Sequence, residues 1–160
     1  MILDDGIDIL VMTETWLYAK GDEACIAEMD ASVTRGYALR SFPRTGSRGG
    51  GIAFILRGTL SVTVHLSNAC PFTESFEAVE LHIRNFSVSV VCPLYRPPPS
   101  RKNKLSNQLF LQEFPEFLTQ FAGSHSDCLA ILTFITMTAN HPVDHLKTML
   151  SDHGLTQLSR

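Results

Sequence analysis

The sequence has little cysteine, and none of it is arranged to hold a metal. Cys25, Cys70, Cys92 and Cys128 stand far apart, with no Cys-x-x-Cys pair of the kind that zinc sites use. Cys92 and Cys128 also lie inside apolar runs that read as strands. Free buried thiols are therefore expected, rather than a zinc site or a disulfide framework.

The chain also lacks long hydrophobic runs and an excess of positive charge. No apolar run approaches the roughly 20 residues of a membrane span, and residues 1–5 are acidic where a secretory signal is basic. An intracellular, soluble protein with no membrane partner is expected, in the nucleus or the cytoplasm. Its 13 Lys and Arg against 16 Asp and Glu exclude a whole-surface positive field, so any DNA contact must come from local basic loops.

What is present fits one domain spanning residues 1–160, with 44% hydrophobic content and no internal repeat. The first half predicts a β-rich meander with strands at residues 7–12, 36–42, 52–56, 60–66, 76–83 and 86–94. Residues 7–12 are continuously apolar, which predicts a strand buried on both faces. Residues 22–32 are polar and predict a partial helix.

The second half alternates helix and strand. Residues 107–122 carry phenylalanines at helical spacing and predict an amphipathic helix, with a kink or restart near Pro115. Residues 128–134 predict a buried strand, and residues 142–153 a second helix. The order favours an α/β or α+β fold in which a two-sheet β-sandwich is flanked by helices.

Three polar stretches follow predicted strands, where the active-site groups of sheet proteins often project. Glu14 leaves the first strand and could hold a hard cation such as Mg²⁺ through its carboxylate, although a purely structural role is the commoner one for such a residue. Residues 47–51 are rich in glycine but lack a P-loop's Gly-Lys-Ser ending, so they predict a hairpin turn. Tyr95 and Arg96 could hydrogen-bond a phosphodiester at the end of a later strand.

The segment after that strand is the most basic part of the chain. Three consecutive prolines at 97–99 forbid regular strand pairing, so an exposed loop is expected. From their charge, these side chains and Arg48 are predicted to contact a DNA backbone: Arg96, Arg101, Lys102 and Lys104.

Taken in order, these stretches resemble the endonuclease domain of non-LTR (LINE-type) retrotransposons. The resemblance rests on residues 8–17, 48–53, 75–77 and 95–98, followed by the Phe-rich helix, an apolar strand and residues 154–157. Thr-Glu-Thr-Trp-Leu and Tyr-Arg-Pro-Pro are the most specific blocks, and the resemblance covers nearly the whole chain.

The resemblance implies an endonuclease/exonuclease/phosphatase (DNase I-like) fold that cleaves phosphate esters with Mg²⁺. Glu14 matches the metal ligand, and Tyr95 matches the tyrosine that orients the phosphate. The family's Gly-Asp-Phe-Asn block is replaced by Thr133-Phe134-Ile135-Thr136, so Phe134 and Thr136 stand where an Asp and an Asn are expected. General-base assistance alone is worth about 10²–10⁴ in rate, so Mg²⁺ binding and activity should both be impaired.

The resemblance also predicts a domain that is incomplete at both ends. The family's first strand, with its metal-site Asn, would precede Met1, and its Ser-Asp-His motif would follow Arg160. Residues 151–153 also read Ser-Asp-His, but they close a helix and are interpreted as structural. Missing strands would leave sheet edges exposed, which predicts self-association.

Three hypotheses follow. The first is a catalytically impaired remnant of the endonuclease domain with weak DNA affinity, and the second is an active Mg²⁺-dependent endonuclease. The third is an interaction module that binds protein chains through exposed sheet edges.

Overall fold

A computed structural model describes residues 6–17, 21–43, 50–65, 75–84, 90–97, 106–124, 129–135 and 151–152. Its first sheet contains β1 (Ile9–Thr13), β2 (Tyr37–Phe42) and β3 (Ile52–Arg57). The strand order is β1-β3-β2 and both pairings are antiparallel. These strands fall where the apolar runs predict them.

The second sheet contains β4 (Ser61–His65), β5 (Glu77–Ala78), β6 (Glu80–Arg84), β7 (Val90–Arg96) and β8 (Leu129–Ile135). The strand β7 pairs with β5 and β6 in antiparallel fashion and with β8 in parallel. Both β5 and β6 keep one continuous register along β7, and the break between them falls at Val79, opposite Pro93. Proline has no N–H to donate, so the ladder is interrupted there.

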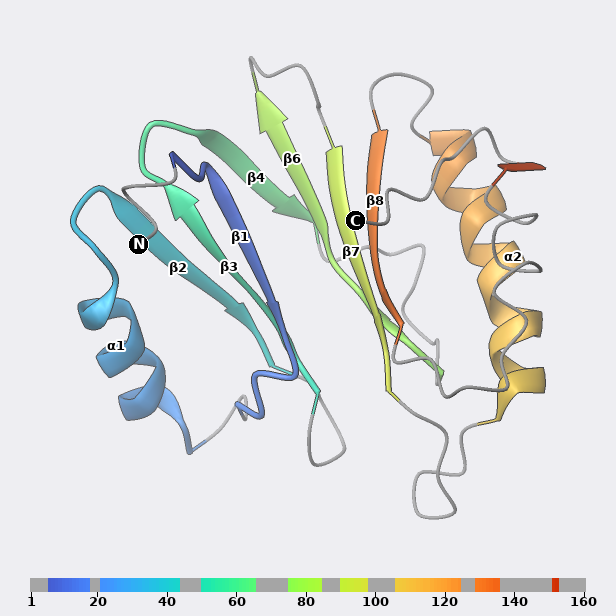
Figure 1. Ribbon diagram of the computed structural model, residues 1–160, viewed down its shortest axis with the longest axis horizontal. Coiled ribbons are helices and arrows are strands. Elements are labelled where there is room, and N and C mark those ends of the chain that lie inside the picture. Colours follow the sequence, from blue (N-terminus) through green and yellow to red (C-terminus); the bar gives the residue numbers. More distant parts are fainter. Residues whose placement is uncertain are drawn as a thin grey trace.

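The two sheets face each other, with α1 (Glu23–Ser32) outside the first and α2 (Asn107–Ser124) outside the second (Figure 1). One core cluster lies between the sheets and includes Phe54, Leu81 and Tyr95. The other lies between the second sheet and α2, and includes Leu94 and Phe114. The predicted sandwich of two sheets flanked by helices is confirmed.

The strand β7 supplies both clusters because successive strand residues point to opposite faces. Val91 and Tyr95 pack between the sheets. Val90, Cys92 and Leu94 pack against α2. The parity of a residue's position along β7 therefore decides which layer its side chain enters.

The helix α2 runs through Pro115 without interruption, so of the two predicted outcomes the restart is wrong and the kink stays a prediction. Phe110, Phe114, Phe117 and Phe121 are all at most 2% exposed, on the face toward the second sheet. Burial of each such ring contributes about 1.5–3 kcal/mol, so the four rings together outweigh the roughly 3 kcal/mol cost of one proline.

Two further predictions need correction. The strand β1 is half-buried along its length instead of buried on both faces, because it is an outer strand of the first sheet. The prediction that β3 and β4 are neighbours in one meander is also wrong. The strand β3 pairs with β1 and β2, whereas β4 pairs with β6 in the other sheet. The turn between them carries the chain from one layer to the next.

Other predictions are tested only in part. Cys92 is buried and Cys25 exposed, both as free thiols, while Cys70 and Cys128 lie outside the described residues. Of the helix predicted at 142–153, only Ser151 and Asp152 are described, and both are helical. Within the described ranges, no helix is long and apolar enough to cross a membrane. Self-association through sheet edges stays a prediction.

Candidate functional site

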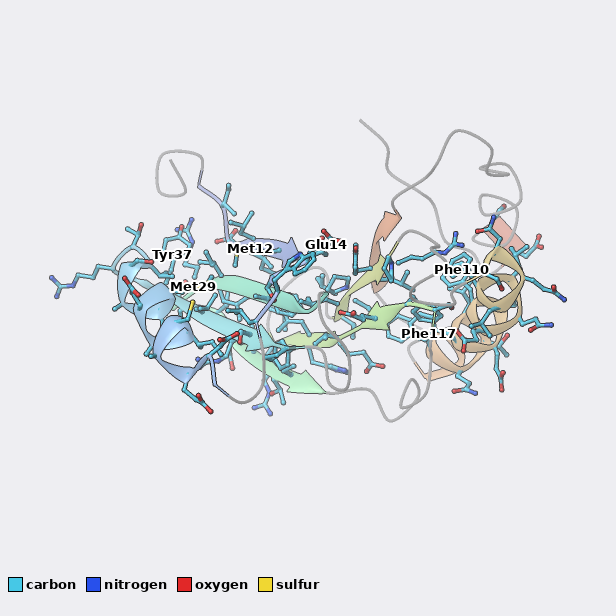
Figure 2. The ribbon with its side chains drawn as sticks, turned by 90° about the horizontal axis from the view of Figure 1, so that it is seen from below. Met12, Glu14, Met29, Tyr37, Phe110 and Phe117 are labelled. Atoms are coloured by element: carbon cyan, nitrogen blue, oxygen red, sulfur yellow. The ribbon has the colours of Figure 1, made fainter. Side chains whose placement is uncertain are left out.

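Two of the residues singled out in the sequence meet at one end of the sandwich. The hydroxyl of Tyr95 donates a hydrogen bond to Oε1 of Glu14, across 81 positions of sequence. Figure 1 shows β1 and β7 ending at the same lower end of the molecule. Figure 2 shows Glu14 just beyond the end of β1, near the middle of the molecule's longest axis. Tyr95 is 3% exposed, whereas Glu14 is exposed. The pair therefore joins the buried space between the sheets to the surface.

Residues 14–16 form a turn with an unusual backbone. Glu14 has a φ of 54° and Trp16 a φ of 57°, both in the left-handed region. This region costs a residue with a side chain about 1–2 kcal/mol, and such outliers gather at functional sites. The backbone leaves β1 through this turn and returns to the core at Leu17, which is buried.

The glycine-rich loop holds this turn in place. The N–H of Thr15 donates to the Gly51 carbonyl at 3.3 Å, and the N–H of Trp16 donates to the Gly50 carbonyl at 2.9 Å. Gly50 and Gly51 have φ values of 82° and 89°, which favour glycine. The strands β2 and β3 pair in antiparallel fashion, which agrees with the predicted hairpin connection, although its residues 44–49 lie outside the described residues. Its end serves as a clamp on residues 14–16.

Glu77 links this clamp to Tyr95. Its Oε2 accepts a hydrogen bond from the Gly51 N–H at 2.7 Å, and its backbone pairs with Tyr95 in β7. A connected path thus runs from Glu14 along its turn to the glycines, through Glu77 to Tyr95, and back to Glu14. In the sequence Glu77 is visible only as part of the resemblance, because no local pattern shows that its carboxylate reaches Gly51.

Replacing Glu77 with alanine is expected to lower the free energy of unfolding by about 1.5–3 kcal/mol, the range for hydrogen bonds to charged groups. The Gly51 N–H would lose its acceptor, and the clamp would loosen. Urea unfolding measures the change. Glu77→Gln keeps an acceptor oxygen and should lose less, so equal stability of the alanine, glutamine and native chains would contradict this role.

The strand β8 brings the departing motif to the same end of the sheet. In the parallel register, Phe134 is the Cα partner of Tyr95, and Thr133 that of Leu94. The backbone position at which the resemblance expects a carboxylate is therefore adjacent to Tyr95. Thr136 lies outside the described residues.

Arg96 does not belong to an exposed loop, so that prediction is wrong. It is the last residue of β7 and is 2% exposed. Following the alternation along β7, it faces α2, where its guanidinium lies 4.3 Å from the ring centre of Phe110 and donates to Oδ1 of Asn107. Burial lowers the pKa of Arg96 from its usual value. The DNA contact predicted for Arg96 from its charge requires an exposed side chain, and Arg96 is buried.

The remaining predicted nucleic-acid contacts, Arg48, Arg101, Lys102 and Lys104, lie outside the described residues. Among the side chains that are described, no three of His, Cys, Asp or Glu gather as a metal site. Glu14 supplies a carboxylate, and the buried Oγ1 of Thr15 has no hydrogen-bond partner within the described part. A hard cation at this place would have the oxygens of Glu14 and Thr15 as protein ligands among the described residues, and water or substrate would have to supply the others.

No protein-family model and no curated protein matches the sequence. Among solved structures, the chain is similar to ANGEL2, a 2′,3′-cyclic phosphatase, with a TM-score of 0.52 and 15% identity over 99% of this chain and 50% of that one. A second structure of the same protein, in complex with adenosine-2′,3′-vanadate, matches with a TM-score of 0.49 and 15% identity over 99% and 51%. The chain thus spans about half the length of the ANGEL2 chain in that structure. At this identity the similarity shows the fold, which is the endonuclease/exonuclease/phosphatase (DNase I-like) fold.

Proposed function

We propose that the chain is a remnant of a Mg²⁺-dependent phosphodiesterase domain of the non-LTR retrotransposon type, with DNA as its ancestral substrate. It keeps part of a phosphoester site and has lost most of its hydrolytic power. The observation that carries this proposal is the hydrogen bond from Tyr95 to Glu14. These two residues were matched to the family's motifs by sequence alone, and the fold brings their side chains into contact.

The retained groups can do part of the chemistry. Mg²⁺ takes oxygen ligands, usually one or two carboxylates together with water and substrate phosphates. Glu14 is the carboxylate that would hold the ion, and the ion would neutralise charge on the phosphate. The Tyr95 hydroxyl donates its one proton to Glu14 in this structure; with the ion holding that carboxylate, it would donate to a phosphate oxygen instead and so orient it.

The missing groups explain the expected loss of rate. By resemblance, an aspartate at position 134 and an asparagine at position 136 would assist the attacking water and grip the phosphate. Phenylalanine offers no oxygen and threonine no amide, so neither task is performed at these positions. Losing general-base assistance costs about 10²–10⁴ in rate, and losing charge stabilisation in the transition state costs more.

A plasmid-nicking assay with Mg²⁺ tests the proposal. The native chain is expected to nick at a rate indistinguishable from Glu14→Gln, which keeps the shape of the side chain but removes its negative charge. The native chain and Glu14→Gln should melt at similar temperatures, because residue 14 is exposed and glutamine keeps an oxygen that can accept from Tyr95. Robust Mg²⁺-dependent turnover by the native chain that Glu14→Gln abolishes would overturn the remnant reading.

That outcome would favour the second candidate, an active Mg²⁺-dependent endonuclease. The observation in its favour is the same intact contact between Glu14 and Tyr95. Its requirement is stricter, since another group must then activate water in place of an aspartate at position 134. Absence of cleavage at high enzyme concentration excludes it.

A further inference from the structure

Trp16 is an anomaly that the proposed chemistry does not use. It is 55% exposed, and it is the only large hydrophobic side chain left exposed among the described residues. Tryptophan is highly buried on average, and neither core cluster includes Trp16. Its neighbour Leu17 is 7% exposed, so the chain returns to the core immediately after it.

The backbone holds Trp16 outward at a cost. Its left-handed φ of 57° suits glycine and strains a residue with a side chain. The turn is nevertheless retained by the hydrogen bond from the Trp16 N–H to Gly50. A residue kept both strained and exposed contributes little to stability, which points to a role in binding.

The location of Trp16 defines what it would bind. It stands two residues after Glu14, so the two Cα atoms lie at most about 7 Å apart. A phosphodiester held at Glu14 and Tyr95 joins two nucleosides, and the base of each nucleoside has a flat π-face. Exposed aromatic rings bind unpaired bases by stacking on them, with little preference for sequence.

We propose that Trp16 is a nucleobase-stacking residue, which binds an unpaired base next to the phosphate at Glu14 and Tyr95. The inference rests on the proposed function, because it takes its phosphate position from that site. It adds a preference for unstacked nucleic acid over a bare phosphate ester. Indole stacking would then supply affinity that survives the loss of catalytic groups at positions 134 and 136.

The chain contains a single tryptophan, so its intrinsic fluorescence reports on this residue alone. The full chain is titrated in Ca²⁺ buffer with oligothymidylate and with an abasic oligomer that carries the same number of phosphates. Oligothymidylate is expected to quench the emission and to bind more tightly, whereas the abasic oligomer should leave the emission unchanged. Equal affinity for the two probes, or no binding of either, would overturn the proposal.

Trp16→Gly is the decisive variant, because glycine tolerates the left-handed backbone of this position. Its affinity for labelled oligothymidylate, measured by anisotropy, should fall roughly 5- to 100-fold, while its affinity for the abasic oligomer stays unchanged. Its melting temperature should exceed that of Trp16→Ala, which retains the strain. Native affinity in Trp16→Gly would sink the idea.

These results are separable from those on the proposed function. If the double variant Phe134→Asp, Thr136→Asn, which restores the two catalytic groups, nicks plasmid but Trp16→Gly binds like the native chain, the phosphodiesterase site stands and the stacking role fails. If base-dependent quenching occurs but the restored variant never cleaves, the stacking role stands and the proposed function fails.

Discussion

The double variant Phe134→Asp, Thr136→Asn is expected to raise the rate of Mg²⁺-dependent plasmid nicking by about 10²-fold or more over the native chain, the lower end of the range for general-base assistance. The register of β8 puts residue 134 beside Tyr95, whose hydroxyl contacts Glu14. A carboxylate introduced there would give the cation a second oxygen ligand and the attacking water a base. The amide at position 136 would add a donor for the phosphate.

Two controls tie any gain to this site. Phe134→Leu, with Thr136→Asn, keeps an apolar side chain and should stay at the native rate. Adding Glu14→Gln to the double variant should return the rate to background. If the double variant is folded by circular dichroism but cleaves no faster than its Leu-containing control, the placement of the family motif on residues 133–136 is wrong.

The second large effect concerns the layer that supports the site. Phe76→Ala is expected to lower the free energy of unfolding by about 3–5 kcal/mol, as for other buried phenylalanines. Phe76 is 2% exposed and makes edge-to-face contacts with Phe110, Phe114 and Phe117, whose ring centres lie 5.4 to 6.1 Å away. Figure 2 shows Phe110 and Phe117 on α2, on the side toward the sheet. Removing the ring would leave a cavity between β7 and α2.

Such a loss is a large fraction of the roughly 5–15 kcal/mol that stabilises a typical domain. Urea unfolding followed by circular dichroism measures it. Phe76→Leu fills most of the space and should lose considerably less. An alanine variant as stable as the leucine variant would show that the aromatic cluster relaxes around the missing ring, and would contradict its close packing.

At the candidate site, local sequence pattern predicts individual residues but not the contacts between them. Glu14 and Tyr95 were identified from short motifs, because a polar group that follows an apolar strand is visible in the sequence itself. Their contact was not visible, since it depends on β1 and β7 ending together in different sheets. The role of Glu77 was hidden for the same reason, as its partner Gly51 lies 26 positions away.

Arg96 shows the opposite failure. A cluster of basic residues next to three prolines indicates an exposed loop, and charge alone assigns Arg96 to it. The boundary between strand and loop falls one residue later, and strand alternation turns the side chain toward Phe110. The charge of the stretch therefore does not decide whether Arg96 is exposed or buried against α2; the position of the strand end does.

The amino-acid sequence by itself determined the strands, the amphipathic helix α2 and the layered class of the fold, because hydrophobic periodicity is a local property of the chain. It also determined that phenylalanine and threonine stand at positions 134 and 136. Only the tertiary structure decided which sheet each strand joins, that Glu14 meets Tyr95, and that Trp16 is held outward in a strained turn. Those outcomes depend on pairings between distant segments, whose register is set by the packing of both sheets at once.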